Sequence, residues 1–324
     1  MVIHIDDKKD EPKIPLIDDN LVQPFSLEKT NLRGRVVRMG SVLQDIISCH
    51  DYPAPVSYLL AEATTLCVLL SAMLKFDGIF TLQIKGSGPI KALVVDVTTD
   101  AKVRAYASFD EQGVKKLAKR KPDRENNFFH LLGEGYVSLT VDQNKKGTER
   151  YQGIVELQGE CLADSVDYYF AQSEQIKTSF KLEIHPQDMQ WRAAAIMLQH
   201  MPEDEIALDD ENGEVSAEDW TRSKILMQTC REEEILSPTM QISDLLYRLF
   251  HEEGVRVYPK ISIEHVCRCS SKKVEDVILS LPKGEVESII EEQGQIGITC
   301  EFCSRGYVYT QDDVNKLTDT HSDT

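Results

Sequence analysis

The sequence predicts an α+β fold in three parts: an N-terminal domain with a mostly antiparallel sheet and packed helices, a metastable helical linker, and a small C-terminal zinc-binding module. Three observations predict it. A long apolar segment is followed by runs in which apolar and polar residues alternate. The composition changes sharply after residue 200. Two close pairs of cysteines, Cys267-x-Cys269 and Cys300-x-x-Cys303, lie near the C-terminus.

The overall composition limits the class of protein. The 324 residues are enough for two domains. A net charge of −18 disfavours binding to nucleic acid, because displacing counterions from phosphates needs Lys and Arg. The N-terminus lacks the apolar core of a secretory signal, and the longest apolar run, residues 66–74, is too short to span a bilayer. We therefore expect a cytoplasmic protein without a membrane partner, in which eight cysteines indicate metal or redox chemistry rather than structural disulfides.

The N-terminal domain is expected over residues 20–185, after a flexible charged tail at 1–19. Ser41 is placed to cap a short helix. Residues 56–74 are apolar on most faces, which predicts a central buried helix. Strands are predicted at residues 34–39, 79–84, 92–97, 102–107, 135–141 and 151–157, a helix at 162–174, and a strand at 180–184 that closes the sheet.

The linker is expected over residues 186–254. Residues 191–198 fit either a last strand or the start of this linker. Between Met201 and Trp220 there are nine Asp or Glu and no Lys or Arg, so this stretch should be loose or weakly helical. Residues 220–234 and 242–251 then show helical spacing. The sequence leaves open whether these helices are metastable or a stable part of the core.

The C-terminal module is expected over residues 255–318, followed by a tail at 319–324. Ser271 is placed to cap a first helix. The two helices predicted between the cysteine pairs offer seven apolar side chains: Val274, Val277, Ile278, Leu281, Val286, Ile289 and Ile290. Because this core is small, metal ligation should contribute much of the folding energy.

The four paired cysteines predict a site for one Zn²⁺ per chain. Four thiolates at about 2.3 Å complete a tetrahedral shell around zinc. Cys267 and Cys269 are alternate residues of an extended segment and can face one ion, and the second pair lies in a tight turn. Zinc-bound thiolates remain nucleophilic, so oxidation to sulfenic acids and disulfides would remove the ligands and unfold the module. On spacing alone, a purely structural zinc site remains the commoner interpretation.

The cysteine spacing also matches that of a known family, and further motifs carry the same likeness. These are His50-Asp51-Tyr52-Pro53-x-Pro55, Leu74-Lys75-Phe76-Asp77-Gly78, Gln83-x-Lys85-Gly86-x-Gly88-Pro89, Arg150-Tyr151-Gln152-Gly153-Ile154-Val155, Tyr169-Phe170-x-x-Ser173-Glu174-Gln175 and Leu281-Pro282-x-x-Glu285-Val286. From about Leu32 to Leu317 the chain resembles the redox-regulated 33 kDa chaperonin (heat shock protein 33) family of bacteria.

The resemblance implies an ATP-independent chaperone that holds unfolding client proteins under oxidative stress, not an enzyme, and it implies no catalytic residue. In such proteins the reduced, zinc-bound state is largely inactive. By motif match the zinc ligands are Cys267, Cys269, Cys300 and Cys303, and the expected disulfides are Cys267–Cys269 and Cys300–Cys303. The C-x-x-C pair is expected to react first. Oxidation should release zinc, unfold the module and linker, expose apolar surface, and favour a homodimer.

Three other functions would also use four paired cysteines. A zinc ribbon for nucleic acid needs a basic face, whereas the C-terminal third is acidic. A zinc enzyme needs an open coordination position, which four thiolates do not leave, and the His-x-Glu of the zinc deaminases is absent. A static zinc-ribbon protein acting as a constitutive binding module is the stronger rival. Outside the motif, Cys49, Cys67 and Cys161 are expected to be inert, and Cys230 could form a mixed disulfide.

Overall fold

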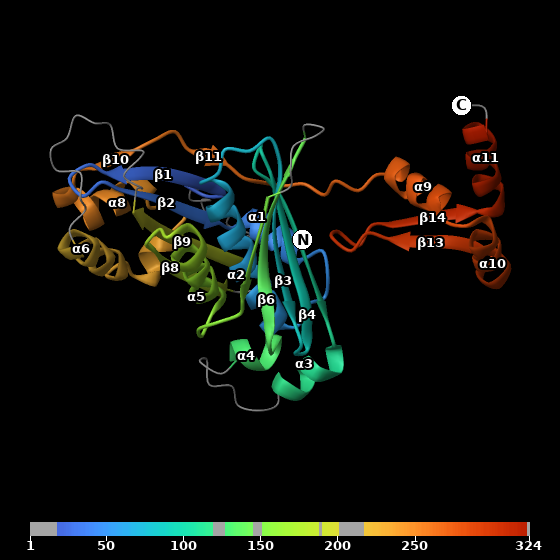
Figure 1. Ribbon diagram of the computed structural model, residues 1–324, viewed down its shortest axis with the longest axis horizontal. Coiled ribbons are helices and arrows are strands. Elements are labelled where there is room, and N and C mark those ends of the chain that lie inside the picture. The colour runs from blue at the N-terminus through green and yellow to red at the C-terminus, as the bar shows by residue number, and fades with distance from the viewer. Residues whose placement is uncertain (1–17, 119–126, 145–150, 188–189, 201–216, 323–324) are drawn as a thin grey trace, which may run out of the picture. The chain divides into compact units, whose positions relative to one another are not determined.

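The computed structural model describes residues 18–118, 127–144, 151–187, 190–200 and 217–322 (Figure 1). Its strands pair mainly antiparallel, so the expected α+β class is confirmed. The chain forms two compact units, each made of separate stretches: residues 1–41 with 167–262, and residues 42–166 with 263–324. Residues 1–17 of the expected tail at 1–19, residues 323–324 of the expected tail at 319–324, and most of the acidic run lie outside the described residues, whereas residues 319–322 belong to a helix.

The sheet of the first unit has the strand order β10-β1-β2-β9-β8, with β11 also paired to β1. Its strands are β1 (Leu21–Leu27), β2 (Leu32–Met39), β8 (Thr178–Gln187), β9 (Gln190–His200), β10 (Val255–Val257) and β11 (Ile261–Ser262). Strand β1 was not expected, because Pro24 argues against a central strand. Pro24 is tolerated because it lies between the residues that pair with β10 and those that pair with β11.

Two expectations for residues 180–198 are resolved by this sheet. The expectation that residues 180–184 close the sheet of the preceding strands is wrong. These residues belong to β8 of this separate sheet. Residues 191–198 lie in β9, the strand alternative. Strand β9 is buried along its centre and lies between β2 and β8, which explains its continuous apolar run.

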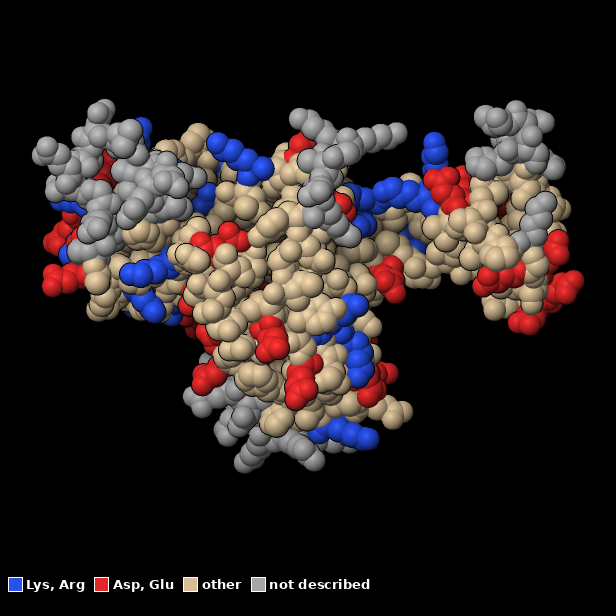
Figure 2. Space-filling view, in the orientation of Figure 1, with Lys and Arg blue, Asp and Glu red and all other residues tan. Residues whose placement is uncertain are grey.

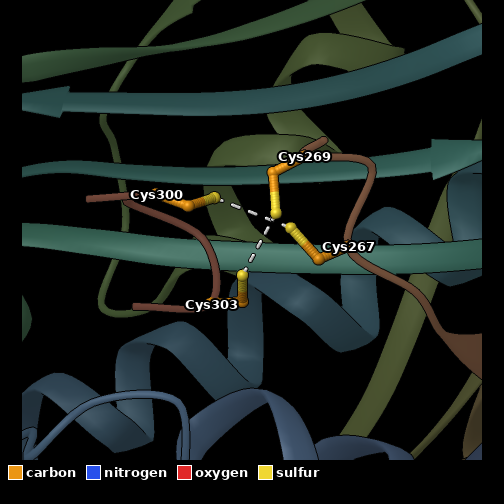
Figure 3. Close-up of side chains that lie close together, drawn as sticks. All are labelled: Cys267, Cys269, Cys300 and Cys303. Carbon is orange, nitrogen blue, oxygen red and sulfur yellow. Dashed lines mark hydrogen bonds between the residues drawn. The ribbon is translucent and has the colours of Figure 1, made fainter. Parts of the chain in front are cut away.

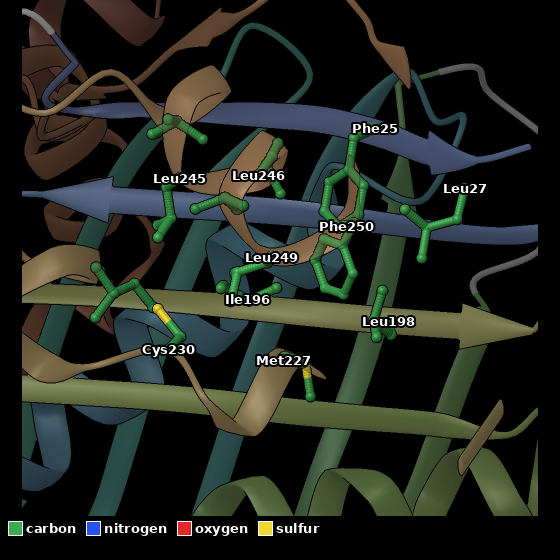
Figure 4. Close-up of a cluster of buried hydrophobic side chains, with 14 of the residues drawn as sticks. Phe25, Leu27, Ile196, Leu198, Met227, Cys230, Leu245, Leu246, Leu249 and Phe250 are labelled. Atoms are coloured by element: carbon green, nitrogen blue, oxygen red, sulfur yellow. The ribbon is translucent and has the colours of Figure 1, made fainter. Parts of the chain in front are cut away.

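The linker helices pack against the same sheet (Figure 4). They are α6 (Ala217–Gln228), α7 (Glu232–Ile235) and α8 (Ile242–Phe250). Helix α8 buries one face and leaves Tyr247 on the other face 66% exposed. Phe250 stacks on Phe25 of β1 with ring centroids 5.8 Å apart. The buried residues shared by sheet and helices include Phe25, Leu27, Ile196, Leu198, Met227, Cys230, Leu245, Leu246, Leu249 and Phe250. The helices therefore bury their apolar faces by covering those of the sheet.

The sheet of the second unit has the strand order β12-β5-β4-β3-β6-β7. Its strands are β3 (Gly78–Gly86), β4 (Ile90–Thr98), β5 (Lys102–Phe109), β6 (Gly135–Gln143), β7 (Tyr151–Glu156) and β12 (Glu264–His265). Helix α2 (Ala54–Ser71) packs against β3, β4 and β5. It is long and apolar enough to cross a membrane, but 83% of that stretch is buried inside the protein, as expected for a core helix. The shorter helices are α1 (Ser41–Ile47), α3 (Glu111–Ala118), α4 (Asn127–Leu132), α5 (Leu162–Tyr169) and a π-helix (Phe170–Glu174).

A buried carboxyl group joins α2 to the start of α5. Glu62 is 3% exposed, and its Oε1 accepts backbone N–H bonds from Leu162 at 2.9 Å and Ala163 at 3.3 Å. Burial raises the pKa of Glu62 from 4.5 to about 7, although these bonds favour the charged form. At neutral pH the side chain is therefore divided between its acid and its carboxylate.

The free energy of unfolding of Glu62→Gln is expected to rise relative to that of the wild type as the pH increases. Between pH 4.5 and 7 the folded wild type keeps the proton that the unfolded chain loses, so its stability falls with pH. Over this range the wild type loses about 3 kcal/mol of its free energy of unfolding, and Glu62→Gln does not undergo this loss. Denaturant unfolding at pH 5, 6, 7 and 8 measures the difference. The exposed Glu111→Gln is the control, and a pH-independent difference for Glu62→Gln would contradict the expectation.

The C-terminal module is built on α9 (Ser271–Ser280), α10 (Lys283–Gln293), β13 (Gln295–Thr299), β14 (Gly306–Thr310) and α11 (Gln311–Ser322). The two expected helices are present, and α11 was not expected. Ser270, rather than Ser271, caps α9 by accepting the Lys273 N–H. Val277 was expected in the core of the module, but its side chain is 53% exposed. The buried residues are Val274, Ile278, Val286, Ile290, Ile296, Tyr309 and Val314.

Candidate metal centre

The first cysteine pair directly follows β12, whose position is fixed by the second sheet. Strand β12 pairs in parallel with β5, and His265 lies opposite Val103. Beyond the strand, the Val266 N–H donates to the Val103 carbonyl at 3.0 Å. Cys267 is the next residue, so the backbone of β5 determines where the C-x-C loop begins.

The second pair lies in the turn that joins β13 to β14. The Cys300 N–H donates to the Arg305 carbonyl at 2.9 Å, and the Ser304 N–H donates to the Cys300 carbonyl at 2.8 Å. Ser304 has a φ of 56°, which lies in the left-handed region and lets the chain turn back sharply. The turn brings Cys300 and Cys303 to the same side, as the spacing predicts.

The four cysteines of the motif come together as a cluster (Figure 3). All four sulfur atoms lie within 4.8 Å of one another. Cys267 Sγ is 3.6 Å from Cys300 Sγ, and Cys269 Sγ is 3.5 Å from Cys303 Sγ. A tetrahedron with metal–sulfur bonds of about 2.3 Å has edges of about 3.8 Å. The spacing and the thiolate donors therefore fit a four-coordinate zinc ion, with no open position for a substrate.

The thiols of this cluster differ in how readily they ionise. Burial opposes ionisation of Cys269, but the Tyr307 hydroxyl and the neighbouring thiols lower its pKa to about 7. Burial and the neighbouring thiols raise the pKa of Cys303 to about 12, and burial raises that of Cys267. Such inequality is typical of thiols that share protons at close range.

The cysteines outside the cluster are free thiols in protected surroundings. Burial raises the pKa of Cys161 to about 12, of Cys230 to about 11, and of Cys67 well above its usual value. Burial and the charges of Cys267, Asp45 and Cys300 raise the pKa of Cys49. Thiols with raised pKa values are weak nucleophiles at neutral pH. Cys230 is 3% exposed, which shields it from mixed disulfides while the linker helices are packed.

Several residues around the cluster were not anticipated as part of a site. His50 Nε2 donates to the Glu301 carbonyl at 2.8 Å, and the Ser304 hydroxyl donates to the Cys49 carbonyl at 2.7 Å. Asp96 and Arg104 of the second sheet contact both cysteine loops through the residues between the cysteines. His50 opens a family-like motif, but an Asp and an Arg on neighbouring strands carry no sequence signal of this kind.

Comparison with known proteins gives a consistent result. The family model described as Hsp33 protein matches residues 20–310. The 33 kDa chaperonin of Caulobacter vibrioides (strain NA1000 / CB15N) is 38% identical over 295 residues, covering 89% of this chain and 94% of the relative. The 33 kDa chaperonin of Proteus mirabilis (strain HI4320) is 34% identical over 293 residues, covering 90% and 94%.

A solved structure shares the fold. The crystal structure of the 33 kDa chaperonin (heat shock protein 33 homolog) from Thermotoga maritima superposes with a TM-score of 0.76 at 22% identity. The alignment covers 94% of this chain and 99% of that chain, so the likeness extends over both compact units and the C-terminal module.

Proposed function

Because this chain belongs to the Hsp33 family, we propose that it is a redox-regulated chaperone that holds unfolding proteins without ATP. In the reduced state Cys267, Cys269, Cys300 and Cys303 bind one Zn²⁺ and the protein is inactive. Oxidation forms the disulfides Cys267–Cys269 and Cys300–Cys303 and releases the metal. The proposed partners are partly unfolded client proteins, and the oxidised chain is proposed to be a homodimer in the cytoplasm.

The observation that carries the proposal is the spacing of the four sulfur atoms. They lie at non-bonded distances that suit a metal, whereas a disulfide needs about 2.05 Å. A thiolate of one pair attacks hydrogen peroxide, giving a sulfenic acid and hydroxide. The second thiolate of that pair displaces a further hydroxide and closes the disulfide. Each pair thereby loses two electrons, and its two sulfurs are no longer available as thiolate ligands.

The loss of ligands is proposed to reach the linker through the fold of the module. Seven buried apolar side chains form the core of α9, α10, β13, β14 and α11. A core of this size gains much of its stability from a bound metal. If residues 255–318 unfold, β10 and β11 leave β1, and helix α8 loses β10 as a neighbour. The apolar faces of α8 and β1 then become available to clients (Figure 4).

The charge of the chain supports an absence of nucleic-acid partners. With a net charge of −18, the protein repels phosphate backbones. On the face shown in Figure 2, Lys and Arg are interspersed with Asp and Glu over the described residues. The proposed clients are instead recognised through apolar surface, which requires no charge complementarity.

Oxidation is expected to release zinc and to switch on protection of clients together. The reduced protein should hold about one zinc per chain. Treatment with peroxide and mild heat, or with hypochlorous acid, should transfer that zinc to a chromogenic chelator. Over the same time course the protein should begin to suppress aggregation of a thermally unfolding client, and a reductant should reverse both changes. Equal protection before and after oxidation would support a static zinc ribbon acting as a constitutive binding module.

A further inference from the structure

Both cysteine loops contact one arginine of the second sheet, Arg104 in β5. Its Nε and Nη2 donate to Asp96 Oδ2 at 2.9 and 2.7 Å. The same oxygen accepts a bond from Arg268, the residue between Cys267 and Cys269. Asp96 therefore joins Arg104 to the C-x-C loop, and it places the first pair of cysteines against β4 and β5.

The C-x-x-C loop contacts the same guanidinium through its aromatic residue. The Arg104 guanidinium carbon lies 3.7 Å from the ring centroid of Phe302, at a distance typical of cation–π contacts. Tyr106, two residues along β5, meets that ring edge-to-face with centroids 4.8 Å apart. Phe302 lies between Cys300 and Cys303, so Arg104 contacts the C-x-x-C loop directly. It contacts the C-x-C loop through Asp96, which accepts the bond from Arg268.

The network is largely protected from water and its central carboxylate is fully paired. Side-chain exposure is 8% for Asp96, 19% for Arg104 and 21% for Arg268. The Thr81 hydroxyl donates to Asp96 Oδ1 at 2.8 Å. Ion pairs with so little solvent are screened less than surface pairs, and removing one partner leaves a buried charge uncompensated. The two arginines tolerate each other only because Asp96 lies between them.

We propose that Arg104, supported by Asp96, is a positioning residue for the metal centre: it holds the C-x-C and C-x-x-C loops at the spacing that four metal-bound thiolates need. The proposal rests on the proposed zinc site. The tightness of zinc binding, and the ease with which oxidants release zinc, then depend on a side chain about 160 residues before the first cysteine. Because Arg268 and Phe302 lie between the paired cysteines, closing either disulfide should also pull the loops away from β5.

The test compares zinc retention in Arg104→Met, Phe302→Leu and the wild type. With the full-length zinc-loaded protein, competition with a chromogenic chelator measures affinity. Supporting residues of metal sites commonly contribute 10- to 100-fold in affinity, and we expect a loss of about 10-fold or more for Arg104→Met. Arg104→Lys keeps the charge but not the planar stacking, and it should restore part of the affinity. Lys115→Met, in an exposed ion pair with Glu111, is the matched control and should change nothing.

Cobalt substitution gives a readout that does not depend on chaperone activity. The charge-transfer bands of Co²⁺ bound to four thiolates should weaken or shift in Arg104→Met and in Phe302→Leu, but not in Lys115→Met. Wild-type affinity and spectrum in Phe302→Leu and Arg104→Met would overturn the proposal. If Arg104→Met disrupts the sheet, Phe302→Leu, which alters only the loop, decides. A wild type that binds zinc through these contacts but protects no client when oxidised would refute the chaperone function alone.

Discussion

Cys300→Ser is expected to abolish tight zinc binding and to unfold the C-terminal module. The substitution removes one of four sulfur atoms that lie within 4.8 Å of one another, and a serine hydroxyl is a poor ligand for zinc at neutral pH. Zinc binding contributes about 10–16 kcal/mol to the folding of small zinc modules, so losing one thiolate removes a large part of that energy. The seven buried apolar side chains of the module are too few to compensate for that loss.

Zinc content and module structure measure this result separately. Metal analysis of purified protein should give about one zinc per chain in the wild type and far less in Cys300→Ser. Amide exchange should show loss of protection in α9, α10 and β13, while the sheet under α2 keeps its protection. The matched control is Cys161→Ser, because Cys161 is a half-buried thiol outside the cluster. A Cys300→Ser protein with wild-type zinc content and chelator resistance would show that the metal lies elsewhere.

The sequence allowed the cysteine cluster to be predicted because its geometry is local. Alternation in an extended segment and a tight turn each bring two thiols to one side, and only the meeting of the two pairs is long-range. The central helix was predictable for a similar reason, since residues apolar on every face have to be buried. Local patterns report what a segment needs, but they do not identify its partner.

The features that sequence did not predict depend on distant partners. Strand β1 is paired with segments more than 200 residues away, which accommodate Pro24. Residues 180–184 have ordinary strand periodicity, which is the same whichever sheet they join. Asp96 and Arg104 resemble surface residues of alternating strands until Arg268 and Phe302 reach them from the C-terminal module. Contacts of this kind follow from topology, which periodicity does not encode.

Arg38→Met is expected to release the linker and to give chaperone activity without an oxidant. Arg38 of β2 is fully buried, and burial lowers its pKa to about 10, so it remains charged at neutral pH. Its guanidinium donates to four backbone carbonyls, and three of them belong to the end of α7 or to the loop between α7 and α8. The four acceptors are Ile235 and Met240 at 2.8 Å, Asp18 at 2.9 Å and Glu234 at 3.3 Å.

Methionine fills the space of this side chain but leaves those carbonyls without their donor. Leaving a buried acceptor without its donor commonly costs about 1–3 kcal/mol, and three of the four acceptors lie within residues 234–240. Limited proteolysis should therefore cut the reduced variant between α6 and α8, and the reduced variant should suppress client aggregation while still holding its zinc. The exposed Lys115→Met is the control, because it loses only a surface pair with Glu111. Arg38→Lys keeps the charge, so its cleavage and its protection of clients should lie between those of the wild type and those of Arg38→Met. If Arg38→Met is cleaved between α6 and α8 but protects no client, exposure of the linker and sheet is not what activates the protein.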